Sequence, residues 1–507
     1  MSLNLASLLT AAAARHPRRP AVVLGDAVID FVTLEALSRR FAGALRGLGV
    51  ARGQHVALLL PNVPWFSVAY WGAHMAGNPV VPLNVLLTGP EVAYHLQDSD
   101  SVVIIAWEGM AAAALAAVEK VPTCRVVVVT ADRAAAPPDG ALAFFALMAA
   151  ADPIDDLAAT MPDDPAVLLY TSGTTGAAKG AQLSHFNMYY NAEYSGTRLL
   201  PLGADTVALV TLPLFHSFGQ TVMHNAVLAR GGCLVLLPRF EPLAALTLMA
   251  KHRVTFFGGV PTMYFALLHH PDAGQFDLSS LSLCVSGGAA MPVEVMRAFD
   301  ERYGVNILEG YGLSETSPVA SFNVLDRPKK PGSVGLPLEG VSFRLTDPTG
   351  ARVTAAGVAG EIEIKGHNVM LGYYRRPQAT AEVLVDGWFK TGDIAIRDED
   401  GYYFIVDRSK DLIIRGGFNV YPREVEEVLY GHPAVGEAAV IGQPDERLGE
   451  EIVAVVALKP GAAATADELI AHCKARLAPY KLPRVVRFVD ALPKGPTGKI
   501  LKRALRG

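Results

Sequence analysis

Cysteine is scarce in this chain of 507 residues, and no two of its cysteines form a CxxC pair. The four are Cys124, Cys233, Cys284 and Cys473. This spacing excludes a disulfide framework and the common cysteine-based zinc sites. It is typical of reduced, buried thiols, so a cytoplasmic location is expected. Uninterrupted apolar runs of about 18 residues are also missing, which argues against an integral membrane segment.

An excess of one charge is missing as well. The chain has 44 Lys and Arg against 49 Asp and Glu, a net charge of −5. Without a global basic field, nucleic acid is not an expected partner. The segment from Met1 to Arg18 has no basic start followed by a clean apolar core. It therefore predicts an amphipathic helix rather than a signal peptide.

The chain has enough hydrophobic residues to form more than one buried core. Hydrophobic residues make up 51% of it and charged residues 18%, which excludes a disordered chain. Its length predicts at least two domains. Over the first 400 residues, continuous apolar runs alternate with helical patterns, as is typical of parallel sheets covered on both faces. The expected strands are Val56–Leu60, Val102–Ala106, Val126–Val129, Ala166–Tyr170, Val207–Leu212, Cys233–Leu237 and Val254–Phe257. Residues 34–48 predict a helix with Thr33 as its N-cap.

The pattern of expected helices and strands changes twice in the second half of the chain. Residues 333–406 hold short strand signals between Gly, Pro and Asp, which indicates a β-rich layer. A charged segment at 407–411 follows, and helix and strand signals then resume. The expected division is an N-terminal domain at 1–406, a hinge at 407–410 and a mobile C-terminal domain at 411–507. The predicted fold class is α/β: a large multi-layer N-terminal domain with mixed, largely parallel sheets, helices and the β-rich layer, then a small α+β domain.

A glycine- and hydroxyl-rich loop, Tyr170–Gly180, follows one of the expected strands. Its glycines allow consecutive backbone N–H groups to converge on an anion, and Lys179 adds a positive charge. Such a loop suits the phosphates of a nucleotide. It is not a Walker A loop, because Ala178 and Gly180 stand where that motif has glycine and Ser/Thr. The alternative is a flexible surface turn.

This loop resembles the phosphate loop of the adenylate-forming superfamily, which includes acyl-CoA synthetases, adenylation domains of nonribosomal peptide synthetases and luciferases. Ala178 departs from the usual proline, which should change loop stiffness more than chemistry. Further segments match the superfamily in order along nearly the whole chain. They are Leu214–Gly219, Ser286–Pro292, Glu309–Glu315, Trp388–Asp393, Asp407–Glu426 and Pro493–Lys499. The chain is identified as a member of this superfamily.

The resemblance implies an ATP-dependent acid–thiol ligase. A carboxylate attacks the ATP α-phosphate, pyrophosphate leaves, and a thiol then displaces AMP from the acyl-adenylate. Two anions must approach each other, so the site needs fixed cations and Mg²⁺ more than a general base. The implied ATP- and AMP-binding residues are Thr171, Ser172, Gly173, Thr174, Thr175, Gly176, Lys179, Gly288, Ala289, Glu309, Gly310, Tyr311, Gly312, Ser314, Asp393, Arg408 and Lys499.

Two of these residues have specific expected contacts with the nucleoside. Tyr311 is implied to stack on adenine opposite Gly288 and Ala289, and its flanking glycines would leave the ring uncrowded. Asp393 ends a Thr-Gly-Asp turn and would accept both ribose hydroxyls. Without the resemblance, a core tyrosine and a turn aspartate that bonds local backbone are equally ordinary interpretations.

The implied metal and catalytic groups come from different segments. Glu315 is the expected Mg²⁺ ligand, with the hydroxyl of Thr174 as a second, because Mg²⁺ prefers oxygen. The alternative for Glu315 is an ordinary helix-start carboxylate. The catalytic residues are Lys499, Lys179 and His216, with Lys499 reaching the α-phosphate and the attacking carboxylate. On composition alone, Lys499 belongs to a solvated basic terminus and His216 to an apolar core.

The acid and thiol sites follow from the same resemblance. The expected acyl pocket consists of His216, Phe218, Val260, Pro261, Met263 and Leu313. The segment around His216 lacks the aspartate with which amino-acid-activating domains bind an ammonium, so the acid should have no α-amino group. Gly416 and Gly417 are the implied coenzyme A (CoA) contacts, because backbone without side chains can approach a pantetheine arm. Lys410 matches the hinge about which the C-terminal domain would rotate between the two half-reactions.

The function expected is therefore an ATP- and Mg²⁺-dependent acyl-CoA synthetase with CoA as co-substrate. The phrase Gly416–Pro422 is like that of fatty acyl-CoA ligases and favours a fatty acid. An aryl-acid ligase, an enzyme that loads a carrier-protein phosphopantetheine, and a silent nucleotide-binding module remain alternatives. A homodimer is also an open expectation.

Overall fold

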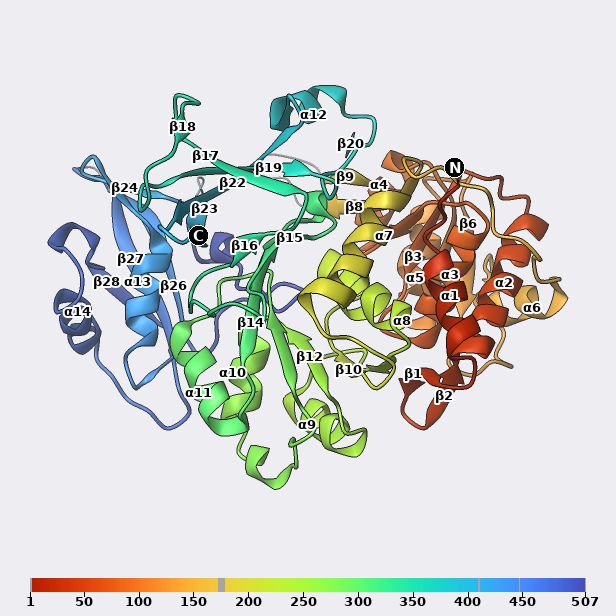
Figure 1. Ribbon diagram of the computed structural model, residues 1–507, viewed down its shortest axis with the longest axis horizontal. Helices are drawn as coiled ribbons and strands as arrows, with labels where there is room; N and C mark the ends of the chain where they lie inside the picture. The colour runs from red at the N-terminus through yellow and green to blue at the C-terminus, as the bar shows by residue number, and fades with distance from the viewer. Residues whose placement is uncertain (1, 172–177, 409–410, 446, 507) are drawn as a thin grey trace.

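The computed structural model describes residues 2–171, 178–408, 411–445 and 447–506. Within these ranges the chain forms four β-sheets with helices packed around them (Figure 1). Three sheets lie in a first lobe, residues 2–408, and the fourth lies in a second lobe, residues 411–506.

The two largest sheets are mainly parallel. One has the order β20 (Gly372–Tyr373), β9 (Lys179–Ser184), β8 (Pro165–Thr171), β4 (Val80–Pro82), β3 (His55–Leu59), β5 (Ser101–Trp107), β6 (Arg125–Val129) and β7 (Leu142–Ala143). The other has the order β16 (Leu336–Pro337), β15 (Val319–Phe322), β14 (Ile307–Gly312), β13 (Leu283–Ser286), β12 (Phe256–Gly259), β10 (Val207–Val210), β11 (Cys233–Leu236), β1 (Pro20–Leu24) and β2 (Ala27–Asp30). Antiparallel pairs occur toward their edges, as between β8 and β9 and between β14 and β15.

The two smaller sheets are mainly antiparallel. The β-rich layer contains β18 (Arg352–Val353), β17 (Val341–Thr346), β19 (Gly360–Gly366), β22 (Trp388–Arg397), β21 (Leu384–Val385) and β23 (Tyr403–Arg408). The sheet of the second lobe contains β25 (Phe418–Val420), β24 (Ile413–Arg415), β27 (Gly449–Leu458), β26 (Val435–Asp445) and β28 (Val485–Phe488). The predicted class, α/β with mixed and largely parallel sheets, a large first part and a small last part, is confirmed.

Helices cover these sheets and lie between them (Figure 1). They are α1 (Ser7–Arg15), α2 (Phe31–Gly47), α3 (Pro64–Met75), α4 (Gly89–Asp98), α5 (Ala111–Val118), α6 (Phe144–Ala150), α7 (His185–Tyr194), α8 (Val227–Ala229), α9 (Pro242–Lys251), α10 (Pro261–His269), α11 (Val293–Tyr303), α12 (Pro377–Val383), α13 (Pro422–Tyr430) and α14 (Ala466–Lys474). A π-helical turn, Gly219–Ala226, leads into α8. None of the helices in the described ranges is long and apolar enough to cross a bilayer.

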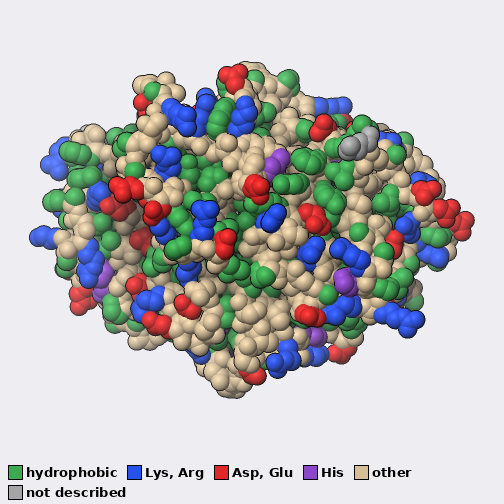
Figure 2. Space-filling view, viewed as in Figure 1, with side chains coloured by type: hydrophobic (Ala, Val, Ile, Leu, Met, Phe, Trp, Pro, Cys, Tyr) green, Lys and Arg blue, Asp and Glu red, His purple; other side chains and the backbone are tan. Residues whose placement is uncertain are grey.

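Each lobe has its own buried core. The main cluster of buried apolar residues runs from Leu5 to Tyr403 and includes both large sheets. A separate cluster from Ile413 to Leu482 packs α13 and α14 against the second lobe's sheet. This separation supports a division near the predicted hinge at 407–410, which stays a prediction, but Asp407 and Arg408 still belong to strand β23 of the first lobe. On the face shown in Figure 2, acidic and basic side chains are interspersed.

Local details differ from the sequence expectations at two points. The predicted helix begins at Phe31, and its N-cap is Asp30, whose carboxylate accepts the Thr33 N–H at 2.9 Å. Thr33 was the wrong cap because a carboxylate three residues earlier satisfies the same first turn. Among the cysteines, Cys233 is partly exposed, whereas the other three are buried.

A cluster of histidines lies buried in the first lobe. The rings of His74 and His185 are 5.7 Å apart, and His224 stacks on Trp71 at 5.3 Å. Both ring nitrogens of His74 lack a hydrogen-bond partner in the described structure. Burial lowers the pKa of His185 and of His224 to about 4, and it lowers that of His74 well below its ordinary value.

We expect this cluster to make the first lobe acid-sensitive. Below pH 6.5 the unfolded chain protonates these histidines, whereas the folded chain resists protonation until about pH 4, so stability falls across that window. One such group contributes about 2 kcal/mol of the loss between pH 7 and 5. Urea unfolding at both pH values should show that His224→Gln loses about this much pH dependence. An unchanged pH dependence in the variant would contradict the assignment.

Candidate active site

A cavity of about 570 Å³ lies between the two lobes. Its lining contains many of the predicted site residues, drawn from separate elements. Those from the first lobe are Val260, Pro261, Gly288, Ala289, Glu309, Gly310, Tyr311, Gly312, Asp393 and Arg408, and Lys499 joins them from the second lobe. The fold therefore brings together residues up to 239 positions apart, counting from Val260 to Lys499.

Tyr311, Asp393 and Arg408 form a hydrogen-bonded group in this cavity. The Tyr311 hydroxyl donates to Asp393 Oδ2 at 2.6 Å, and Arg408 Nε lies 3.1 Å from Asp393 Oδ1. Burial and the Asp393 carboxylate raise the pKa of Tyr311 well above its ordinary value, so the hydroxyl stays protonated. Asp393 is 4% exposed and lies within strand β22, not in the turn that the sequence suggested. Gly392, at φ 72°, lets the strand continue through the Thr-Gly-Asp segment.

The glycines around Tyr311 have a packing role that the sequence argument did not foresee. A Cβ on Gly312 would lie 1.7 Å from the Pro318 carbonyl oxygen, and one on Gly310 would lie 2.5 Å from the Phe322 ring. Both glycines are needed because β15 and the residue before it approach β14 closely. The absence of side chains on both neighbours of Tyr311 is therefore a consequence of this packing.

Glu309 is the most buried carboxylate of the cavity lining. Its Oε1 accepts the Met291 N–H at 3.0 Å, while its Oε2 has no hydrogen-bond partner among the described residues. Burial raises the pKa of Glu309 to about 7. Glu309 thus keeps one carboxylate oxygen buried without a hydrogen-bond partner, an arrangement that disfavours its charged form.

Glu315 forms a second polar group next to the phosphate loop. It lies in the short 3₁₀ turn Ser314–Thr316 and is 7% exposed. Its Oε1 accepts hydrogen bonds from Tyr373 at 2.9 Å and from Thr171 at 3.3 Å. Burial raises its pKa. Lys179 is close, with its Nζ 5.3 Å from the centre of the Tyr373 ring.

These groups fit a magnesium ion held mainly by substrate phosphates. Mg²⁺ in nucleotide sites commonly takes one or two protein carboxylates, with phosphate oxygens and waters completing its shell. Glu315 supplies one buried carboxylate, with hydroxyls beside it, and a cation there would offset the burial of its charge. The other predicted ligand, Thr174, lies outside the described residues.

Lys499 lies in a loop that docks on the first lobe. The loop closes through a bridge between Lys494 and Ile500, and the Gly498 carbonyl accepts a hydrogen bond from Thr262 Oγ1 at 2.9 Å. Gly498 has φ 80°, and a Cβ there would lie 3.0 Å from the Val260 side chain. A glycine therefore lets the backbone approach α10 and carry Lys499 into the cavity.

His216 is electrostatically coupled to Lys499. Burial, together with a smaller effect of the Lys499 charge, lowers the pKa of His216 to about 4. The ring is neutral at pH 7, and its Nδ1 accepts the Phe218 N–H at 3.3 Å, which leaves the proton on Nε2. His216 and Lys499 were both expected to lie near the attacking carboxylate, and their electrostatic coupling agrees with this expectation.

The remaining predicted site residues differ in whether they line the cavity. Of the acyl-pocket group, Val260 and Pro261 line the cavity, while Phe218 packs against Gly287. His216, Met263, Leu313 and Ser314 are not among the described residues that line it. The predictions for Ser172, Gly173, Thr174, Thr175, Gly176 and the hinge Lys410 lie outside the described residues. Thr171 was expected inside the loop but is the last residue of β8, and its contact with ATP stays a prediction.

Gly416 and Gly417 form the tight turn between β24 and β25. Both have positive φ, 57° and 83°, which matches a two-residue hairpin turn. The Gly416 N–H donates to the Leu448 carbonyl at 2.8 Å. Neither glycine lines the described cavity, so any contact with a thiol substrate there requires another placement of the second lobe.

Two groups of site residues escaped the sequence analysis. Tyr373, the partner of Glu315, lies 58 positions from it, in a segment without a recognisable motif. Arg423 and Glu427 line the cavity from α13, although the sequence presents them as ordinary polar residues of an amphipathic helix. Their spacing of four residues was a signal of a shared helix face.

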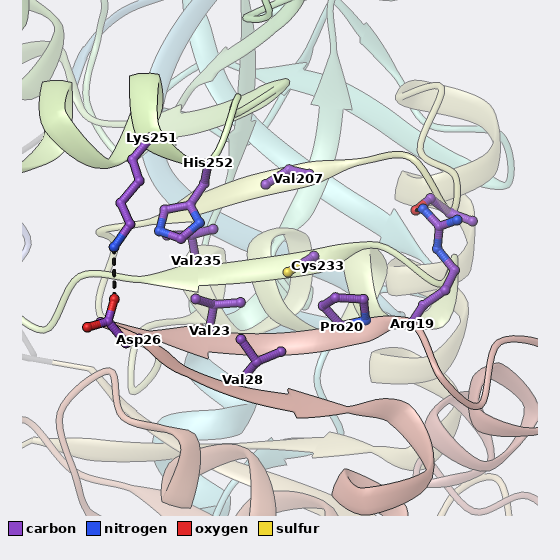
Figure 3. A pocket seen from close by; sticks show the side chains of 12 residues that line it. Arg19, Pro20, Val23, Asp26, Val28, Val207, Cys233, Val235, Lys251 and His252 are labelled. Atoms are coloured by element: carbon purple, nitrogen blue, oxygen red, sulfur yellow. Dashed lines mark hydrogen bonds and ion pairs between the residues drawn. The ribbon is translucent and has the colours of Figure 1, made fainter.

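A second cavity of about 450 Å³ lies elsewhere on the first lobe, and none of the predicted site residues lines it. Figure 3 shows Val23, Val207 and Val235 facing it, with Cys233 beside them. Lys251 and Asp26 form a 3.0 Å ion pair at one end.

Comparison with known proteins assigns the family of this chain. The profile described as AMP-binding enzyme matches residues 9–374, and the profile for the C-terminal domain of that enzyme matches residues 424–499. The chain belongs to the AMP-binding enzyme family, which confirms the predicted adenylate-forming superfamily.

Individual relatives extend along the whole chain. A long-chain-fatty-acid–CoA ligase of Bacillus subtilis is 39% identical over 530 residues, covering 99% of this chain and 94% of its own. A feruloyl-CoA synthase of Amycolatopsis sp. is 41% identical over 496 residues, covering 97% and 96%. Among solved structures, an anthranilate CoA ligase bound to anthranoyl-AMP has a TM-score of 0.94 at 30% identity, covering 100% of this chain and 97% of that one. These relatives confirm the predicted class of enzyme, an AMP-forming acid–thiol ligase.

Proposed function

We propose that this protein is an ATP-dependent acyl-CoA synthetase that activates a fatty acid. The observation that carries the proposal is the cavity in which Lys499, Tyr311, Asp393 and Arg408 meet between the lobes. The fatty-acid ligase relative and the phrase Gly416–Pro422 favour a fatty acid as substrate.

The first half-reaction makes the acyl-adenylate. The nucleoside lies between Tyr311 and Gly288–Ala289, and its ribose meets Asp393. The acid's carboxylate oxygen attacks the α-phosphorus, the bond to the bridging oxygen breaks, and pyrophosphate leaves. Lys499 and Arg408 supply fixed positive charge where negative charge gathers on the α-phosphoryl oxygens. Mg²⁺, bound at Glu315, would neutralise charge on the departing phosphates.

The second half-reaction makes the thioester. The CoA sulfur attacks the acyl carbonyl carbon, the thiol proton is lost, and AMP leaves with the bonding electron pair. Neutral His216 lies near the reacting carboxyl group without adding a charge to it. The resting arrangement has Lys499 in the site and the Gly416–Gly417 turn outside it, so the second lobe must move between the two steps.

An aryl acid is the second candidate substrate class. The feruloyl-CoA synthase relative, at 41% identity, and the structural similarity to an anthranilate CoA ligase favour it. A homodimer and a cytoplasmic location stay proposals, the former to be checked by light scattering.

One assay separates these possibilities. Purified protein is given ATP, Mg²⁺ and CoA with a panel of fatty and aryl acids, and both pyrophosphate and acyl-CoA are measured. We expect acyl-CoA from long-chain acids at a higher kcat/KM than from benzoate or hydroxycinnamates. A preference for the aryl acids would show that the substrate is an aryl acid and not a fatty acid. Adenylate formation with transfer only to a carrier-protein phosphopantetheine would show that CoA is not the acceptor. Failure to form an adenylate with any acid would refute the proposed function.

A further inference from the structure

Helix α13 of the second lobe holds onto the first lobe through Arg423. Its backbone N–H donates to Asp407 Oδ2 at 3.1 Å, and its guanidinium donates to the Ile405 carbonyl and, at 3.3 Å, to the Gly332 carbonyl. The side chain is 13% exposed. One arginine therefore ties α13 to the last strand of the first lobe and to the loop before β16.

One turn further along α13, Glu427 meets the start of a first-lobe helix. Its Oε2 accepts the N–H of Val293, the first residue of α11, at 3.5 Å. Helix α11 has no side-chain cap of its own, because its N-cap is Pro292. A carboxylate from the second lobe thus occupies the place of a cap, where the helix dipole favours negative charge. Burial raises the pKa of Glu427, and Arg423, 3.8 Å away, opposes this shift.

These two side chains are also coupled to the nucleotide site. Both line the cavity that holds Lys499. Of their two charges, that of Arg423 lowers the pKa of Glu309 and that of Glu427 raises it. The two lobes also meet at the loop that carries Lys499, where the Gly498 carbonyl accepts a hydrogen bond from Thr262. The second lobe is therefore docked on the first both through α13 and through this loop.

We propose that Arg423 and Glu427 are positioning residues that hold the second lobe where Lys499 faces the nucleotide. This inference rests on the proposed function, since it assigns the pair to one half-reaction. Without the pair, the second lobe loses part of the docking that places Lys499, and a displacement of about 1 Å at a catalytic group can cost 10²-fold in rate. Adenylate formation depends on this placement, whereas thioester formation, which requires the second lobe to leave, does not.

The test compares the two half-reactions in Arg423→Ala and in Glu427→Gln. Acid-dependent exchange of pyrophosphate into ATP reports adenylate formation, and CoA acylation from supplied acyl-adenylate reports the second step. We expect exchange to fall about tenfold or more, with the second step changed less than about twofold. Arg423→Lys should recover part of the exchange, because it keeps a donor and the charge.

Glu424→Gln is the matched control. Glu424 lies on the same helix but pairs with Lys481 inside the second lobe, at 2.6 Å, so its loss should not separate the half-reactions. Equal loss of both steps in Arg423→Ala and Glu427→Gln, or unchanged exchange in both, would overturn the proposal. If Arg423→Ala does not fold, the ratio of pyrophosphate exchange to CoA acylation in Glu427→Gln decides, and equal loss of both steps or unchanged exchange in that variant would overturn the proposal. Wild-type protein that makes no acyl-CoA would instead refute the proposed function.

Discussion

Lys499→Ala should abolish adenylate formation while leaving the second half-reaction intact. The lysine is one of the cations with which the second lobe lines the cavity, and its charge already lowers the pKa of His216. Removing a preorganised charge from a phosphoryl-transfer site typically costs roughly 10²–10³-fold in rate. Acid-dependent pyrophosphate exchange should fall by that factor, and CoA acylation from supplied acyl-adenylate should continue near the wild-type rate.

Lys494→Ala is the control for this substitution. Lys494 belongs to the same loop but pairs with Glu437 at 2.6 Å, within the second lobe. Its loss should leave the ratio of the two half-reactions unchanged. If Lys499→Ala slowed both steps equally, the division of labour between them would be wrong.

Glu315→Gln should produce the next largest loss, and it should change the metal requirement. The substitution keeps an oxygen that accepts from Thr171 and Tyr373 but removes the charge that would bind Mg²⁺. We expect adenylate formation to fall about 10²-fold and the Mg²⁺ concentration for half-maximal rate to rise. Titration of pyrophosphate exchange with Mg²⁺ at saturating ATP measures both effects.

Tyr373→Phe is the companion variant, because it removes a hydroxyl donor and leaves the Glu315 charge. Its Mg²⁺ dependence should stay close to that of wild type. A Glu315→Gln enzyme with an unaltered Mg²⁺ dependence would show that the ion binds elsewhere.

Much of the framework was predictable because it depends on local patterns. The run Val126–Val129 is continuous and β-branched, and it forms all of β6 except its first residue, Arg125. The apolar spacing of Leu34, Phe41 and Leu45 placed their side chains on the buried face of α2. The resemblance to the adenylate-forming superfamily then assigned distant segments to one site, which hydrophobic periodicity could not do. The structure does bring Tyr311, Asp393 and Lys499 of these segments together in one cavity.

What stayed hidden depends on contacts between distant elements. Gly312 was expected to free the Tyr311 ring, but its role is set by the Pro318 backbone. Asp393 looked like a turn residue because Thr-Gly-Asp suits turns, but it pairs with Arg408 of β23, and the pairing of β22 with β19 shifts register across this segment. The capping of α11 by Glu427 joins residues 134 positions apart, a relation that only the docked lobes reveal.

The most direct test of the account is a crystal structure with a non-hydrolysable acyl-adenylate analogue. The account predicts adenine beside Tyr311, the ribose hydroxyls on Asp393 and the Lys499 ammonium within hydrogen-bond distance of the α-phosphoryl or acyl oxygens. An analogue bound outside this cavity, or one whose phosphoryl group lies far from Lys499 while the second lobe is docked as here, would contradict it.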